Sequence, residues 1–269
     1  MAARTHACPP PRRRGSDARQ RLIVALDATA LAPALRLARA LRGSARTVKV
    51  GSALFTACGP EAVRRLRALG FAVMLDLKFL DIPSTVALSC RSAAGLGVAL
   101  LTVHASGGRA MLEAAVRGAR EGAWRSARPG VLAVTVLTSD AGGSSAERVM
   151  ALANGAVNAG CDGLVASAQE AAALRRRFGP RLRIACPGIR PSGGAGDDQR
   201  RTAAPGEALR AGADWLVGGL FQHQVVAEAD QRLLVQPPGC RQPGATKRTT
   251  AKCGVCPPAG CDGISARAS

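Results

Sequence analysis

The sequence contains no tyrosine, two tryptophans and five phenylalanines in 269 residues. A core built from it must consist mainly of alanine, leucine and valine. No aromatic residues alternate with the arginines to stack on bases, for example over residues 63–67. The formal charge of +19 therefore indicates a solvated basic surface, and we expect no specific nucleic-acid partner. The alternative is a polyanion-binding protein, whose DNA binding would depend strongly on salt.

Long hydrophobic runs are also missing. The longest, residues 98–103, has the length of a strand and is too short to cross a membrane. Residues 1–20 contain a proline run and an arginine run but no apolar stretch, which excludes a secretory signal. We expect a cytoplasmic protein that does not contact membranes and has a disordered basic arm over residues 1–20.

Nine cysteines are present, and their distribution does not indicate a disulfide framework. Five are scattered along the chain, as expected in a reducing cytosol: Cys8, Cys58, Cys90, Cys161 and Cys186. In the tail, Cys253 and Cys256 have the spacing of a metal-ligand pair, but no second regular pair accompanies them. We therefore expect no metal site.

Lysine is scarce, with only four among 37 basic residues. Arginine supplies the routine surface charge. Lys49 and Lys78 are the only lysines before the tail, and each lies in or at the end of an apolar, strand-like run. Lysine can lose and regain a proton near neutral pH, whereas arginine cannot. These two positions therefore indicate a chemical role.

The segment 76–83 places two carboxylates and an ammonium group within a few residues, directly after the apolar run 71–75. Alternate residues of a strand share a face, so Asp76 and Lys78 are expected to point the same way. Charges at the end of a buried strand are unfavourable unless they are paired or used. The segment is either catalytic or a strand-end salt bridge.

Eight short apolar runs alternate with amphipathic helical patterns, the arrangement expected of βα units. The runs are 22–26, 47–50, 71–77, 99–103, 131–137, 163–166, 182–186 and 215–217, and the clearest helical patterns are 31–41, 61–69, 110–120, 146–159 and 168–178. They predict an α/β fold, a closed (β/α)₈ TIM barrel over residues 21–221. An open doubly wound sheet is the alternative, but no Gly-x-Gly-x-x-Gly turn follows the first run. Residues 222–269 are expected to be an atypical and mostly disordered tail, in which only 224–235 has a helical pattern.

In such a barrel, chemistry takes place at the carboxyl ends of the strands. Polar residues occupy those positions here: Asp27, Lys49, Asp76, Lys78, His104, Thr138 and the segment 187–190.

Taken together, the motifs resemble those of the orotidine 5′-phosphate decarboxylase family. They occur in the family's order and cover residues 21–219. The matching segments are 24–27, 49–51, 76–85, 103–108, 134–139, 187–191 and 198–200.

The resemblance implies a homodimer with a shared active site that decarboxylates orotidine 5′-monophosphate to UMP without metal or organic cofactor. Lys78 would protonate C6 of the pyrimidine, and Asp76 would face the departing carboxylate. Lys49 and Asp81 would complete an alternating charge network, with Asp81 reaching into the partner subunit's site. His104 receives no proton-transfer role.

The resemblance also implies a substrate-binding set. Asp27 would bind the ribose or base, Thr85 lies on the exchanged loop, and Thr138 would touch the pyrimidine edge. Arg190 and Gln199 would hold the phosphate, and the glycine-rich segment 191–197 would form a lid.

The last phosphate motif departs from the family pattern. Where the family has Gly-Arg-Pro, this chain has Gly219, Leu220 and Phe221, so leucine replaces the arginine that grips the phosphate. The similarity stops there, as a shifted reading frame would produce. We expect impaired activity. The alternatives are a catalytically dead barrel that binds UMP-like ligands, and a related sugar-phosphate decarboxylase or aldolase.

Overall fold

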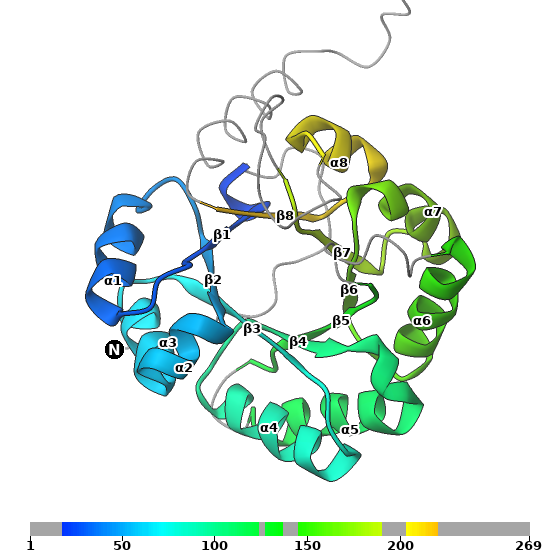
Figure 1. Ribbon diagram of the computed structural model, residues 1–269, viewed down its shortest axis with the longest axis horizontal. Coiled ribbons are helices and arrows are strands. Elements are labelled where there is room, and N and C mark those ends of the chain that lie inside the picture. Colours follow the sequence, from blue (N-terminus) through cyan, green and yellow to red (C-terminus); the bar gives the residue numbers. More distant parts are fainter. Residues whose placement is uncertain (1–17, 124–126, 137–144, 190–202, 220–269) are drawn as a thin grey trace, which may run out of the picture. The chain divides into compact units, whose positions relative to one another are not determined.

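The computed structural model describes residues 18–123, 127–136, 145–189 and 203–219. Within them, eight parallel strands close into a barrel in sequence order (Figure 1). The strands are β1 (Leu22–Ala25), β2 (Thr47–Gly51), β3 (Ala72–Phe79), β4 (Leu100–His104), β5 (Gly130–Val134), β6 (Gly163–Val165), β7 (Arg183–Cys186) and β8 (Trp215–Gly218).

Helices surround the ring of strands (Figure 1). They are α1 (Leu31–Ala40), α2 (Ser52–Cys58), α3 (Pro60–Ala68), α4 (Pro83–Gly95), α5 (Gly108–Glu121), α6 (Ala146–Asn158), α7 (Ala168–Phe178) and α8 (Pro205–Ala211), with short 3₁₀ turns η1 (Ala18–Gln20) and η2 (Ala105–Gly107). None of the helices in the described ranges is long and apolar enough to span a membrane.

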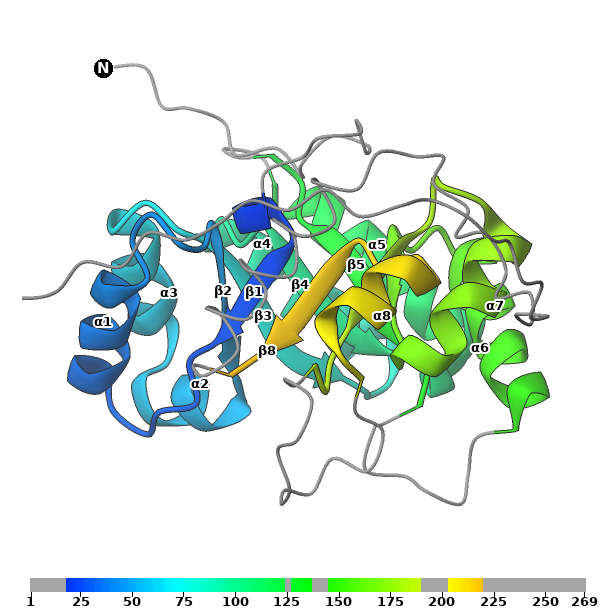
Figure 2. The ribbon, with the colours of Figure 1, turned by 90° about the horizontal axis from the view of Figure 1, so that it is seen from above.

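The barrel closes where β1 pairs with β8, which run side by side in Figure 2. Alternate strand residues point inward and outward, so the apolar core has two parts. One part contains strand residues alone and fills the barrel: Ile23, Met74, Leu100, Leu132, Val134, Val165, Ala185, Trp215 and Val217. The other lies between the strands and the helices.

The predicted barrel is confirmed, and the open doubly wound sheet is excluded because β1 and β8 are hydrogen-bonded. Most predicted strand boundaries differ from the observed ones by at most one residue, and two differ by more. β5 ends at Val134, before the predicted end of its apolar run, and β3 continues to Phe79, beyond the predicted Leu77. An apolar run marks burial, whereas a strand ends where its ladder of hydrogen bonds ends.

The segment between β2 and β3 holds two helices, although the pattern predicted only one, over residues 61–69. Gly59 separates them with φ of 57°, a backbone conformation that favours glycine, and Pro60 starts α3 at the position where proline is best tolerated. The extra helix, α2, follows directly on β2 and therefore borders the carboxyl end of the barrel.

Helices α4 and α5 approach each other closely because glycine faces their contact. A Cβ on Gly118 would meet the carbonyl oxygen of Ala87, and a Cβ on Gly122 would meet that of Arg91. This packing fixes α4, and with it the segment that joins β3 to α4.

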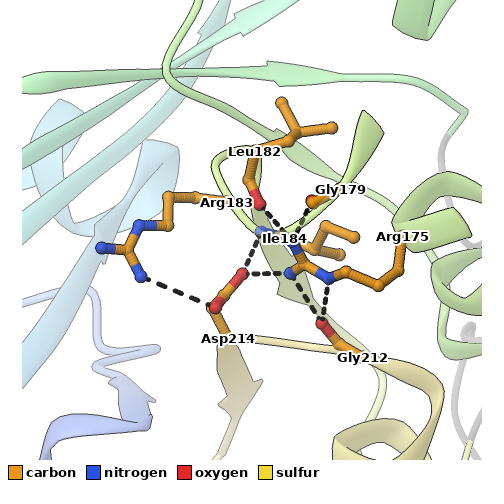
Figure 3. Close-up of polar contacts among 7 residues, drawn as sticks. All are labelled: Arg175, Gly179, Leu182, Arg183, Ile184, Gly212 and Asp214. Carbon is orange, nitrogen blue, oxygen red and sulfur yellow. Dashed lines mark hydrogen bonds and ion pairs between the residues drawn. The ribbon is translucent and has the colours of Figure 1, made fainter. Parts of the chain in front are cut away.

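A network of buried charges lies at the amino end of β7 and β8 (Figure 3). Asp214 comes directly before β8, and its Oδ2 accepts hydrogen bonds from Arg175 Nη2 at 2.5 Å and from the Ile184 amide at 2.9 Å. Arg183 lies 3.6 Å from the other carboxylate oxygen. The network ties α7 to both strands, on the side of the barrel away from the predicted chemistry.

Candidate active site

A pocket opens at the carboxyl ends of β1, β2 and β3. Its lining includes Asp27, Lys49, Asp76 and Lys78, together with the first residues of α2. Four of the ten predicted site residues are thus brought together by the pairing of β1 with β2 and of β2 with β3.

Asp76 is the centre of the charge cluster. Its Oδ2 atom accepts a hydrogen bond from Lys78 Nζ at 2.9 Å and lies 3.5 Å from Lys49 Nζ. Lys49 Nζ also lies 3.7 Å from Asp27 Oδ1. Acid and ammonium groups therefore alternate from Asp27 through Lys49 and Asp76 to Lys78.

The cluster keeps Asp76 ionised. Burial alone would raise the pKa of this carboxyl, but the charges of Lys49 and Lys78, with hydrogen bonds from Lys78 and Thr102, lower the pKa below its ordinary value. Asp27 at the pocket rim is mostly exposed, with 73% of its side-chain surface accessible, so water screens its charge. The inner part of the site therefore presents two ammonium groups and one buried carboxylate.

The backbone is irregular where Asp76 meets Lys78. Lys78 has φ of 49° and is the one non-glycine residue in the described ranges with positive φ. The register between β3 and β4 also shifts between Leu75 and Phe79. Such irregularities re-aim side chains and are frequent next to active sites. The predicted meeting of Asp76 and Lys78 is present, although it takes place on an irregular strand.

Asp81 stands apart from this cluster. Its Oδ1 accepts a hydrogen bond from the Ile82 amide at 2.6 Å, and within the described ranges it forms no ion pair with either lysine. Asp81 and Thr85 are both exposed. A single chain therefore does not bring these two residues to the pocket.

Most of the remaining predicted residues fall outside the part of the chain that the structure describes. Thr138, Arg190, Gln199 and Leu220 lie outside the described residues, as do the glycine-rich segment 191–197, the arm 1–17 and the tail from 220 onward. Gly219 is described, directly after β8, and an added Cβ there would meet no atom within 4 Å.

His104 ends β4 near the cluster. Its Nδ1 lies 3.1 Å from Ser106 Oγ, and burial and the charge of Lys78 lower its pKa. Burial and the nearby ammonium group of Lys78 therefore disfavour the protonated imidazole.

Thr102 is a polar residue of the site that the sequence reasoning missed. Thr102 is fully buried within β4, and its hydroxyl lies 2.9 Å from Asp76 Oδ1. The sequence does show one hydroxyl side chain within the otherwise apolar run 99–103. Because a buried apolar strand does not need a hydroxyl, this residue could have been singled out.

The described residues contain no group of three or more histidine, cysteine, aspartate or glutamate side chains placed to hold a metal ion. Polar chemistry at the pocket comes from the lysine–aspartate cluster. A closed eight-stranded parallel barrel with such a cluster at the carboxyl ends of its strands defines a (β/α)₈ enzyme.

Comparison with known proteins identifies its family. The family model described as "Orotidine 5'-phosphate decarboxylase / HUMPS family" matches residues 20–219. The chain is 50% identical to the orotidine 5′-phosphate decarboxylase of Halorhodospira halophila over 210 residues, covering 74% of this chain and 87% of that protein. It is 49% identical to the one from Anaeromyxobacter sp. strain K over 209 residues, covering 74% and 89%.

Solved structures agree. The orotidine 5′-phosphate decarboxylase of Lactobacillus acidophilus matches with a TM-score of 0.65 and 31% identity, covering 80% of this chain and 97% of that one. The chain belongs to the orotidine 5′-phosphate decarboxylase family.

Proposed function

We infer that this barrel catalyses the decarboxylation of orotidine 5′-monophosphate to UMP in pyrimidine biosynthesis. The observation that carries the inference is the cluster of Lys49, Asp76 and Lys78 in a pocket at the carboxyl end of the barrel, in a chain of this family.

The cluster suits the chemistry. When the bond between C6 and the carboxylate breaks, its electron pair stays on C6 as carbon dioxide leaves. A fixed ammonium group next to C6 stabilises this developing negative charge. Lys78 then donates a proton to C6 as a general acid and regains one from solvent. Asp76 holds the Lys78 Nζ in place through a hydrogen bond of 2.9 Å. Lys49 lies between Asp27 and Asp76 and offsets their negative charge.

The rest of the substrate is assigned to the remaining residues of the predicted set. Asp27 binds the ribose or base at the rim, Thr138 contacts the pyrimidine edge, and Arg190 and Gln199 bind the phosphate. Support for Asp27 is its place in the pocket wall beside Lys49. For the other three, support comes from their positions in the matching motifs.

We assign the site to a homodimer. Within the described ranges, three large hydrophobic residues are exposed, Leu80 at 56%, Ile82 at 63% and Leu88 at 64%. Leu80 and Ile82 flank Asp81 on the segment before α4, and Leu88 lies in α4 together with Thr85. Burying them against a second copy would remove apolar surface from water. Asp81, which pairs with neither lysine of its own chain, would then reach the partner's cluster.

Mixing two inactive variants tests the shared site. Lys78→Ala and Asp81→Ala chains, refolded or co-expressed together, form mixed dimers in which one site has both residues intact. Statistical assembly of a two-fold dimer predicts recovery of about a quarter of wild-type activity. If the mixture is no more active than the separate variants, Asp81 does not contribute to the partner's site.

The decarboxylation itself is tested by following the pyrimidine ultraviolet absorbance when the purified protein meets orotidine 5′-monophosphate, with Lys78→Ala as the control. We expect turnover that survives a chelator. The sugar-phosphate enzymes on this barrel would lose activity when a divalent metal is removed. Absence of turnover in the wild-type chain and in Leu220→Arg would contradict the proposed function.

We propose that Leu220 weakens the enzyme. The family match runs to residue 219, and leucine follows where the resemblance places a phosphate-binding arginine. A charge-assisted hydrogen bond contributes about 1.5–3 kcal/mol. Leu220→Arg is therefore expected to raise kcat/KM by about 10- to 200-fold, and Leu220→Gln is the uncharged control. An unchanged kcat/KM in the Leu220→Arg variant would contradict this explanation.

We place the protein in the cytoplasm. Supporting this, Cys58, Cys90, Cys161 and Cys186 are free thiols, as expected in a reducing compartment.

A further inference from the structure

The irregular part of β3 leaves polar backbone groups that need a partner. Between the paired positions Leu75–Leu101 and Phe79–Val103, β3 contains more residues than β4. The extra length contains Asp76 and Lys78, so the regular ladder of hydrogen bonds is interrupted at the site.

Thr102 fills this interruption from the opposite strand. Its Oγ1 accepts a hydrogen bond from the Lys78 amide at 2.9 Å and lies 2.9 Å from Asp76 Oδ1. A hydroxyl has one proton, and a carboxylate can only accept. The Thr102 proton therefore points at Asp76, and the orientation of the hydroxyl is fixed by its two partners.

The two oxygens of Asp76 consequently have different partners. Oδ1 accepts from Thr102, whereas Oδ2 faces the ammonium groups of Lys78 and Lys49. The bond to Oδ1 sets the rotation of the carboxylate plane, and that rotation decides where Oδ2 holds Lys78 Nζ. The same hydroxyl holds the backbone of Lys78 in its positive-φ conformation.

We propose that Thr102 is a positioning residue for the decarboxylation: its hydroxyl locks the carboxylate of Asp76 and the strained backbone of Lys78 into one arrangement, so that the ammonium group is already placed when substrate arrives. Thr102 acts through Asp76 and Lys78. The proposal rests on the proposed function, and its test separates the two.

The test compares Thr102→Val, which keeps the shape and removes the hydroxyl, with Thr102→Ser, which restores it. Thr135→Val is the matched control, because Thr135 is also a buried threonine of the barrel but donates its hydroxyl to the Val165 carbonyl at 3.2 Å. We expect kcat to fall by about 10-fold or more in Thr102→Val with KM changed by less than about threefold. Thr102→Ser should recover most of kcat, and Thr135→Val should retain it.

A purely structural role would not move the pH profile. Loss of the hydrogen bond to its ionised form raises the pKa of Asp76, so the acid limb of kcat should move to higher pH in Thr102→Val but not in Thr135→Val. Equal kcat and equal acid limbs in these two variants would overturn the proposal. If Thr102→Val does not fold, Thr102→Cys replaces it, and equal kcat in the cysteine and serine variants would be the contrary result.

A readout independent of turnover separates this proposal from the proposed function. Carbon-13 NMR of labelled aspartate follows the titration of Asp76, with Asp76→Asn used to assign the signal. A wild-type chain without turnover would contradict the decarboxylase function, yet the titration would still test Thr102. An Asp76 titration midpoint unchanged between wild type and Thr102→Val would contradict the positioning role.

Discussion

The two ends of the barrel each carry a cluster of charges around a buried aspartate, and the clusters differ in their cation. At the carboxyl end, lysines surround Asp76 beside a pocket. At the amino end, arginines surround Asp214 (Figure 3). A second ion pair between an arginine and an aspartate also lies at the amino end of the barrel. In it, Arg128 donates hydrogen bonds to both carboxylate oxygens of Asp162.

The difference lies in how completely each cation is satisfied. Arg175 donates to the Gly179, Leu182 and Gly212 carbonyls as well as to Asp214, with bonds of 2.5–3.2 Å that use all three of its nitrogens. Its planar fork is fixed by these partners. Within the described residues, Lys78 Nζ donates one side-chain hydrogen bond, to Asp76, and 37% of the Lys78 side chain is exposed. The arginine network ties α7 to the amino ends of β7 and β8, whereas the lysine network leaves donors for a substrate.

Replacing Lys78 by arginine should have the largest effect. The variant keeps the charge but cannot give up its proton, and its larger planar head does not fit the position of Nζ. We expect kcat to fall by at least about 100-fold, the lower range for loss of a general acid. The ultraviolet assay measures the rate, and thermal unfolding serves as the control because Tm should change little. Retention of more than a tenth of kcat would show that proton donation does not require lysine here.

Replacing Arg175 by lysine is the reciprocal exchange. Lysine cannot reach the Gly212, Gly179 and Leu182 carbonyls together with Asp214, so a buried carboxylate loses part of its pairing. Breaking a buried pair lowers the free energy of unfolding by about 3–5 kcal/mol, and a retained charge should reduce this to about 2–3 kcal/mol. Denaturant unfolding measures the change, while kcat of the folded protein should stay the same.

Arg176→Lys is the matched control for this exchange, since Arg176 is the next residue of α7 and is exposed. A change of less than about 0.5 kcal/mol is expected there. If Arg175→Lys and Arg176→Lys lower the free energy of unfolding equally, the hydrogen bonds of Arg175 would contribute no more to stability than an exposed arginine does.

The sequence predicted one of these clusters and missed the other, for a physical reason. Lys49 and Lys78 could be singled out because lysine is rare in this sequence. Their positions in or at the end of apolar runs placed them at the carboxyl end of the barrel. Arg175 had no such signal, because it is one of many arginines and its partners lie in the segments that precede β7 and β8. Only the closed fold shows that it is buried.

The details of the active site were likewise beyond the sequence. The eight strands could be predicted because burial leaves an apolar pattern. The positive φ of Lys78 and its bond to Thr102 depend on the register between β3 and β4, which no local pattern encodes. The family resemblance assigned Asp81 to the charge network, but in one chain its carboxylate accepts a hydrogen bond from the neighbouring Ile82 amide instead.

The smallest expected effect is the pH dependence of stability at the carboxyl end. The pKa of Asp76 is lower in the folded protein than its ordinary value of 3.8 because of Lys49, Lys78 and Thr102, which outweigh burial. A depressed pKa stabilises the folded state at pH values above the unfolded pKa, and this contribution disappears as pH falls through the folded one.

The free energy of unfolding of wild type minus that of Asp76→Asn should therefore be constant from neutral pH down to about pH 5 and decrease below about pH 4. Denaturant titrations at several pH values measure it, and Asp27→Asn is the control because that carboxylate is mostly exposed. A difference that grows as pH falls would mean that the lysines do not hold Asp76 ionised. The cluster at the carboxyl end would then not contain a permanently ionised aspartate, and the comparison with the arginine network would fail.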